Sequence, residues 1–262
     1  MDIAPLTPEP SLSTARRDRQ RIRYAIVGAG AIVAGIWLVW LMAWALGWDM
    51  DNLGIRPREI GGLVGILSAP FVHASFEHLM SNTLPLGLLA AMMLYAYPRA
   101  TRIALPLIWI VSGLGVWLWA RASVHVGISG VTHGLMFFLF CIGLLRRDRL
   151  GVSIALLVFF LYGGMVLTVF PREEHISFEY HLAGALSGIV AAVLLFRRDP
   201  LPPRKRYSWE DEDEAASAPL DGSELELPRP RDVPVLWEGP RVHEVGGDNI
   251  VEFPGPRNRT LH

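Results

Sequence analysis

Long apolar stretches separated by short charged breaks run through the chain from Tyr24 to Phe196. The hydrocarbon core of a bilayer is about 30 Å thick, and a helix needs about 20 apolar residues to cross it. Six stretches have about this length, and we expect each to form a transmembrane helix: residues 24–47, 75–97, 102–120, 127–145, 151–170 and 178–196. The pattern therefore predicts an all-α, polytopic membrane protein.

A shorter apolar stretch, from Ile60 to Val72, lies between the first two predicted helices. It is too short to span a bilayer, and it is interrupted by three glycines and by Pro70. These properties are typical of an interfacial or re-entrant part of a loop. We therefore expect a bundle of six helices with a re-entrant first loop.

The two ends of the chain are polar. Residues 1–23 are expected to form a basic N-terminal tail, residues 24–197 the membrane domain, and residues 198–262 an acidic, proline-rich tail. Residues 200–262 alone hold 13 of the 25 acidic residues. Highly charged segments with few apolar residues cannot bury a core, so we expect the C-terminal tail to be largely disordered and solvated.

Basic residues are distributed unequally between the two sides of the predicted bundle. Fifteen lie on one side, in the N-terminal tail, the second and fourth breaks and the segment up to Arg206. The other side has four, which are Arg56, Arg58, Arg121 and Arg172. The positive-inside rule then predicts that both termini are cytoplasmic, in agreement with an even number of spans. We expect a multi-pass protein of a bacterial plasma membrane.

Cys141 is the only cysteine, which excludes an intrachain disulfide and a cysteine-based metal site. The first apolar stretch is too long for the apolar region of a signal peptide, and no small-residue cleavage site follows it. We therefore expect a permanent first helix.

Polar residues inside predicted spans occur at one common depth. Asn82, Ser129 and His181 lie 17, 17 and 16 residues before the basic residue that ends their respective spans. At about 1.5 Å per residue, each is about 24–26 Å from the cytoplasmic boundary, a little below the outer surface. Ionisable and strongly polar residues are costly inside a membrane, and they mark functional sites by default.

The polar residues of each span also lie on one face of their helix. His78 and Asn82 are four residues apart, and so are Ser129 and His133, so each pair shares one helix face. The fourth and sixth spans also carry glycines four residues apart, at residues 130 and 134 and at residues 184 and 188. Small residues at this spacing allow two helices to approach closely, which would bring Ser129 towards His181.

A serine beside a histidine forms a nucleophile and its general base. Acyl transfer also generates an oxyanion that needs hydrogen-bond donors, which the side chains of His78 and Asn82 and the backbone N–H of Ser129 can supply. Each residue also has a purely structural interpretation. A transmembrane serine often bonds to its own backbone, and an asparagine or histidine can bridge helices.

Three motifs in this order resemble the rhomboid family of intramembrane serine proteases. The first is the His-x4-His-x3-Asn pattern of FVHASFEHLMSN, residues 71–82. The second is GISG, residues 127–130, which is similar to the family's GxSG at the start of its fourth helix. The third is HLAGALSG, residues 181–188, which resembles the family's sixth-helix histidine followed by two glycines. The resemblance covers the chain from about Trp48 to Phe196.

The resemblance implies a catalytic dyad in which Ser129 is the nucleophile and His181 the general base. It implies that His78 and Asn82 stabilise the oxyanion and that Gly127 shapes the same loop. Substrates would be transmembrane proteins in the lipid bilayer. No cofactor, metal or nucleic acid is expected.

His133 falls where relatives often have an aromatic residue that packs on the catalytic histidine, so a supporting role is expected for it. Many relatives also carry a Trp-Arg pair in the first loop, whereas the corresponding stretch here reads GGLVGIL. Glu179 is two residues from His181, about 200° around a helix, and so is expected to point elsewhere. His73, His125 and His175 lie in predicted outer loops, where we expect ordinary loop roles.

Two other functions fit parts of the pattern. A zinc hydrolase could use His78, His181 and a third histidine, but the chain has no HExxH motif, and Glu77 is the one acidic residue placed to act as its base. A non-catalytic rhomboid-like protein could bind transmembrane helices without cutting them. A transporter fits less well, because no paired broken helices occur in corresponding halves of the chain.

Overall fold

A computed structural model describes residues 12–171 and 176–201, and the described chain is almost entirely helical. The long helices are α1 (Leu12–Leu46), α3 (Phe76–Ala96), α4 (Pro98–Trp119), α5 (Ser129–Arg146), α6 (Arg149–Tyr162) and α7 (Phe178–Leu195). α6 continues as the 3-10 helix η4 (Gly163–Val169). The described part of the chain contains six helical segments long and apolar enough to cross a membrane, counting α6 and η4 as one. This confirms the predicted six-span, all-α membrane architecture.

The predicted and observed boundaries differ most at α1. The apolar stretch begins at Tyr24, but the helix begins at Leu12 and includes five arginines, the last of which is Arg23. Arginine is a good helix former, so the helix continues past the end of its apolar stretch. The predicted tails cannot be compared further, because residues 1–11 and 202–262 lie outside the described residues.

The first loop, residues 47–75, contains only short helical turns. They are η1 (Asp51–Leu53), η2 (Ile60–Leu63), α2 (Gly65–Ser68) and η3 (Ala69–Phe71). None is long enough to span a bilayer, as expected from the glycines and proline of this stretch.

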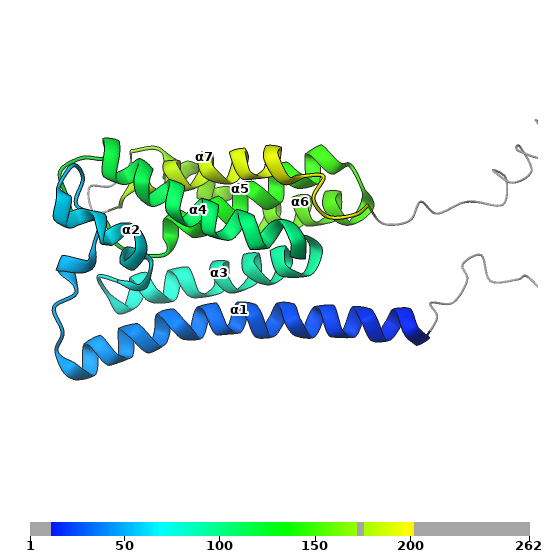
Figure 1. Cartoon of the computed structure of the whole chain (residues 1–262), viewed down its shortest axis with the longest axis horizontal. Coiled ribbons are helices and arrows are strands. Elements are labelled where there is room, and N and C mark those ends of the chain that lie inside the picture. Colours follow the sequence, from blue (N-terminus) through cyan, green and yellow to red (C-terminus); the bar gives the residue numbers. More distant parts are fainter. Residues whose placement is uncertain (1–11, 172–175, 202–262) are drawn as a thin grey trace, which may run out of the picture. The chain divides into compact units, whose positions relative to one another are not determined.

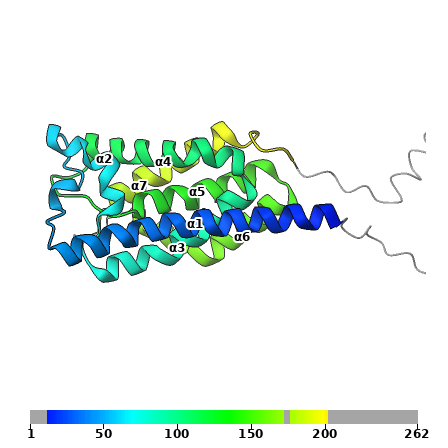
Figure 2. The same cartoon turned by 60° about the horizontal axis from the view of Figure 1, so that its bottom comes forward.

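α5 is the central helix of the bundle. It packs most extensively on α7 and also contacts α3, α4 and α6, whereas α1 packs on α3 at the edge (Figures 1 and 2). Accordingly, 61% of the residues of α5 and 56% of those of α7 are buried within the protein. The helices that carry the GISG and HLAGALSG motifs are therefore the two most enclosed.

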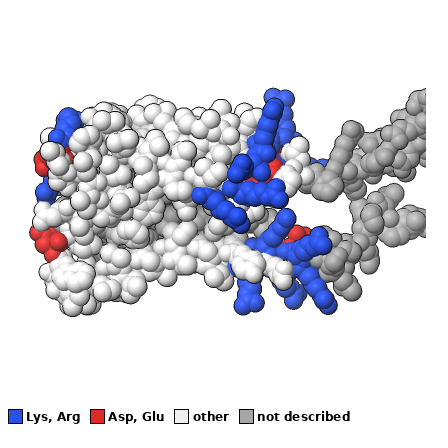
Figure 3. Space-filling model, viewed as in Figure 1, with Lys and Arg blue, Asp and Glu red and all other residues white. Residues whose placement is uncertain are grey.

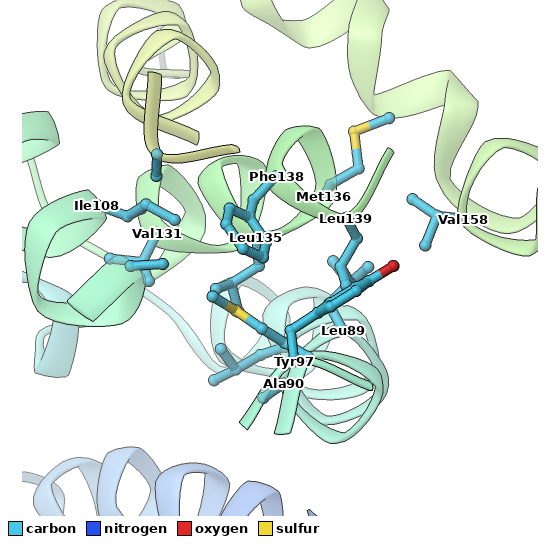
Figure 4. Close-up of a cluster of buried hydrophobic side chains, with 14 of the residues drawn as sticks. Leu89, Ala90, Tyr97, Ile108, Val131, Leu135, Met136, Phe138, Leu139 and Val158 are labelled. Atoms are coloured by element: carbon cyan, nitrogen blue, oxygen red, sulfur yellow. The ribbon is translucent and has the colours of Figure 1, made fainter. Parts of the chain in front are cut away.

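The inward faces of α3, α4, α5 and α6 form one apolar core (Figure 4). Leu135, Phe138 and Leu139 project from α5 into this core and are fully buried. Tyr97, at the α3–α4 corner, lies edge-on to Phe138, with ring centroids 6.2 Å apart. Close packing of this core fixes where the first turns of α5 lie.

Glycines allow α5 and α7 to cross at very short range. A Cβ atom added to Gly184 would overlap the carbonyl oxygen of Gly130, and one added to Gly188 would overlap that of Gly134. The two small-xxx-small patterns therefore face each other, as their spacing predicts.

The first loop is held against α4 and the segment before α5. The indole N–H groups of Trp109 and Trp117 donate to the carbonyls of Ile66 (3.1 Å) and Glu59 (2.8 Å). The Arg58 guanidinium donates to the carbonyl of Ala120 (2.8 Å). Tryptophans from α4 thus anchor a loop that lacks the Trp-Arg pair common in relatives.

A second anchor joins the first loop to the GISG segment. Ile55 and His125 exchange two backbone hydrogen bonds of 2.9 Å, and the N–H of Gly127 donates to the carbonyl of Ala69 (2.9 Å). The conformation of the segment before Ser129 is therefore fixed by the first loop.

Most of the arginines of the described chain gather at the end of the bundle where α1 begins, and we call them the arginine cluster (Figure 3). At the same end, the buried carboxylate of Asp199 accepts hydrogen bonds from the backbone N–H groups of Arg99 and Ala100, both 2.9 Å. These N–H groups belong to the first turn of α4 and have no acceptor within the helix. The guanidinium of Arg146 donates to the carbonyls of Phe196, Asp199 and Pro200. The chain after α7 is thereby tied to α4 and α5.

Candidate active site

Ser129 and His181 meet at the end of the bundle opposite the arginine cluster. Ser129 is the first residue of α5, and His181 lies in the first turn of α7. The Nε2 atom of His181 is 3.0 Å from the Oγ atom of Ser129. This distance is within the hydrogen-bond reach required of a nucleophile and its base.

The other ring nitrogen of His181 faces a backbone carbonyl. Its Nδ1 atom is 3.0 Å from the carbonyl oxygen of Thr168, in η4. A carbonyl only accepts, so Nδ1 carries the proton and donates it. In the neutral ring, Nε2 then presents its lone pair to the Ser129 hydroxyl. The ring is held in the tautomer that can accept a proton from Ser129.

His133 stacks on His181. The ring centroids are 3.9 Å apart, and the ring planes differ by 11°. Its Nδ1 lies 2.7 Å from the carbonyl of Ser129, and its Nε2 lies 2.8 Å from the hydroxyl of Thr168. His133 therefore lies in the position expected for the packing residue and also bonds to the segments on both sides of it.

Gly127 has a φ of +102°, in a region that residues with a side chain rarely adopt. A Cβ atom at this position would lie 2.6 Å from Cε1 of His78. Only glycine allows the His78 ring to approach the GISG segment this closely. The side-chain amide of Asn82 donates to the carbonyl of His78 one turn earlier in α3 (2.9 Å).

These side chains line one cavity of about 720 Å³ at the starts of α3, α5 and α7. The sequence-predicted residues that line it are His78, Asn82, Ser129, His133 and His181. The remaining lining includes the apolar residues Pro85, Val126, Met165 and Ile176. The structure thus gathers into one cavity residues that lie up to about a hundred positions apart in the sequence.

The acceptor for the His181 ring is not the neighbouring acidic residue, Glu179. Its carboxylate is buried and lies 3.6 Å from the guanidinium of Arg121. The backbone carbonyl of Thr168, and not a carboxylate, is therefore the acceptor for the His181 ring.

The loop histidines lie outside this arrangement. The His125 ring lies 2.6 Å from the hydroxyl of Ser177, which caps α7, and 3.1 Å from the carbonyl of Arg121. Burial lowers the pKa of His125 below its ordinary value. His125 therefore joins two segments of the chain in its neutral form.

His73 is also buried. Its ring lies edge-on to that of His78, with centroids 5.1 Å apart, and neither of its nitrogens has a hydrogen-bond partner within the described chain. Burial, and secondarily the nearby His78, lowers the pKa of His73 to about 4. His175, the third loop histidine, lies outside the described residues.

Thr168 is the site residue that sequence reasoning did not single out. It is a threonine in an apolar stretch, and its main contribution is a backbone carbonyl, which every residue type has.

As for metals, no three His, Cys, Asp or Glu side chains in residues 12–171 and 176–201 lie close enough together to hold an ion.

Comparison with known proteins identifies the family of the chain. The model of the Rhomboid domain matches residues 60–198. An uncharacterized protein of Mycobacterium bovis and one of Mycobacterium tuberculosis are each 37% identical over 198 residues, which is 71% of this chain and 80% of theirs. An uncharacterized protein of Mycobacterium leprae is 34% identical over 187 residues, covering 67% of this chain and 74% of its own. With three motifs on the helices of a six-span bundle and a domain match over more than half of its length, the chain belongs to the rhomboid family.

Proposed function

We propose that this protein is an intramembrane serine endopeptidase that cleaves membrane-anchored proteins near the outer face of a bacterial plasma membrane. The observation that carries the proposal is the 3.0 Å contact between Nε2 of His181 and Oγ of Ser129, with Nδ1 of His181 bonded to a carbonyl. A serine hydroxyl becomes a strong nucleophile only when a base takes its proton, and this ring is oriented to do so.

The reaction proceeds in two halves. In the first, Oγ of Ser129 attacks the scissile carbonyl carbon while its proton moves to Nε2 of His181. The tetrahedral intermediate then collapses, the C–N bond breaks, and His181 returns the proton to the leaving amine. In the second half, His181 takes a proton from a water molecule, whose oxygen attacks the acyl carbon. The ester bond breaks and Ser129 regains its proton.

The developing oxyanion is stabilised by donors at the mouth of the same cavity. The backbone N–H of Ser129 opens a helix, where N–H groups have no intrahelical acceptor. The ring of His78 and the amide of Asn82 line the cavity beside it. Donors that are already oriented in a site contribute more than the same donors in water.

The orientation of the protein follows from its charges. The arginine cluster at the start of α1 and at the α3–α4 and α5–α6 corners is assigned to the cytoplasmic side. Ser129 and His181 then lie near the outer face, at the level where a membrane-anchored substrate leaves the bilayer. The cavity's mixture of apolar walls and a few polar groups suits an extended peptide segment of such a substrate.

The test is cleavage of a model single-span substrate by the purified protein in detergent, together with labelling by a fluorophosphonate probe. Wild-type protein is expected to cleave and to be labelled, and Ser129→Ala to do neither. Labelling without cleavage would point to a wrong substrate. A folded protein that does neither would be a rhomboid-like binding protein. EDTA is expected to leave the rate unchanged, and inhibition that zinc reverses would favour a metal hydrolase.

A further inference from the structure

Thr168 contacts both rings of the stacked histidine pair. Its carbonyl accepts from Nδ1 of His181 (3.0 Å), and its hydroxyl lies 2.8 Å from Nε2 of His133. His133 in turn bonds through Nδ1 to the carbonyl of Ser129 (2.7 Å). With the Ser129–His181 contact, these bonds form a closed ring of four residues.

Proton counting assigns the donors in this closed circuit of four hydrogen-bonded residues. The carbonyls of Ser129 and Thr168 can only accept, so Nδ1 of His133 and Nδ1 of His181 each carry a proton. In a neutral His133 ring, Nε2 must then accept, and the Thr168 hydroxyl is its donor. The hydroxyl also lies 2.8 Å from the carbonyl of Met165, to which it cannot donate at the same time.

Charge favours the neutral state of His133 during the reaction. His181 becomes an imidazolium when it takes the proton of Ser129. Two charged rings 3.9 Å apart would repel each other strongly in a site shielded from water. By donating to His133, the Thr168 hydroxyl stabilises the neutral form of His133, which stacks on the charged His181.

We propose that Thr168 is a positioning residue that holds His181 and His133 in their working orientation, acting through its hydroxyl on His133 and through its carbonyl on His181. The inference rests on the proposed protease function. The competing explanation is that the hydroxyl only bonds to Met165 and stabilises η4, in which case its loss would lower stability without a specific effect on turnover.

The first arm of the test compares side-chain variants of Thr168. Thr168→Val keeps the shape of the side chain and removes the hydroxyl, while Thr168→Ser keeps the hydroxyl. We expect Thr168→Val to lower kcat about tenfold or more with KM within twofold of wild type, because small errors in position are costly to rate. Thr168→Ser should restore most of the rate. Thr101→Val, which removes a buried hydroxyl bonded to Met93 and Tyr97, is the matched control and should leave kcat unchanged.

The second arm is a double-mutant cycle with His133→Phe, which keeps a stacked ring but lacks both hydrogen bonds. If the hydroxyl acts through His133, Thr168→Val should cost little further rate in the His133→Phe background. A full tenfold loss in that background would overturn the proposal. So would a folded Thr168→Val protein with wild-type kcat. If Thr168→Val does not fold, His133→Phe alone must show the loss of kcat, and wild-type turnover in that variant would overturn the proposal.

The third arm does not depend on activity. Nitrogen-15 NMR of histidine-labelled protein should show His133 and His181 as neutral rings protonated at Nδ1. In Thr168→Val the Nε2 resonance of His133 should shift, because this nitrogen loses its hydrogen-bond donor while Nδ1 keeps its acceptor. A wild-type His181 protonated at Nε2 would overturn the positioning role. A wild-type protein that shows the expected tautomers but neither cleaves nor is labelled would instead contradict the proposed function.

Discussion

Gly184 lies so close to Gly130 that a Cβ atom on Gly184 would overlap the carbonyl oxygen of Gly130. This contact sets the separation of α5 and α7, and therefore the distance between the two residues proposed to carry out proton transfer. The spacing of the two helices and the geometry of the Ser129–His181 pair therefore both depend on the absence of a side chain at Gly184.

We expect Gly184→Ala to lower stability by about 1–3 kcal/mol, because an added methyl group in a close-packed contact forces the helices apart. Cleavage should fall at the same time, since the Ser129–His181 contact lengthens. Gly35→Ala in α1 is the matched control, because a Cβ there meets no atom within 4 Å. Thermal unfolding in detergent and cleavage rate are the measurements. A Gly184→Ala protein as stable and active as Gly35→Ala would contradict the assigned packing.

Ser129→Ala and His181→Ala are each expected to abolish cleavage while the protein remains folded. One removes the nucleophile and the other the base, and neither change adds bulk to the bundle. Cleavage of a single-span substrate is the measurement, with unfolding temperature as the control for folding. Near wild-type cleavage by either variant would disprove the dyad.

Asn82→Ala should slow cleavage without preventing probe labelling. Loss of one oxyanion donor costs about 10²–10³ in turnover in an aqueous protease, and the remaining donors here should reduce the loss. Leu84→Ala, on the exposed face of the same helix, controls for general effects on α3. An unchanged rate would mean that Asn82 serves only its bond to the carbonyl of His78.

His73 makes stability depend on pH. Its pKa is lowered to about 4 in the folded protein, so below about pH 6.5 the unfolded chain binds more protons than the folded one. Its contribution to stability is therefore complete above about pH 6.5 and is lost as the pH falls towards 4, by about 3 kcal/mol. Unfolding temperatures of wild type and His73→Gln across this range provide the measurement. The variant should show a flatter profile, and identical slopes would refute the assignment.

Deleting residues 207–262 should leave cleavage in detergent within twofold of full-length protein. The deletion retains Asp199, whose carboxylate caps α4, and Pro200, whose carbonyl bonds to Arg146. Asp199→Ala in the full-length chain should instead lower stability by about 0.5–2 kcal/mol, the usual effect of losing a helix cap. Rates and unfolding temperatures of both proteins, measured side by side, are the test. A tenfold loss of activity on truncation would show that the tail couples to the bundle.

Much of this architecture could be predicted because a bilayer imposes strong constraints on sequence. Span lengths are set by membrane thickness, and polar residues inside spans are rare enough that Ser129 and His181 stand out. The glycine spacing in α5 and α7 correctly indicated which helices meet. The cooperation of His133 with its neighbours could be foreseen only as packing, because its hydrogen-bond partners lie on different segments.

Other features were not predictable because they use groups without a sequence signal. The carbonyl of Thr168 reaches His181 only because η4 follows a particular path. Likewise, Trp109 and Trp117 appear in the sequence as ordinary apolar residues of a span, yet their N–H groups anchor the first loop. The arginines of α1 were assigned to a tail because composition alone does not reveal where a helix stops.

The change from α6 to η4 has a mechanical consequence. At about 1.5 Å per residue, the 14 residues of α6 extend about 21 Å, which is short of a hydrocarbon core of about 30 Å. The seven residues of η4, at about 2.0 Å each, add about 14 Å and complete the crossing. A 3-10 helix has poorer hydrogen-bond geometry than an α-helix, so this stretch opens at a lower free energy than α5 or α7. Amide hydrogen exchange should therefore be faster in η4 than in the other walls of the cavity, and each such opening withdraws the carbonyl of Thr168 from His181.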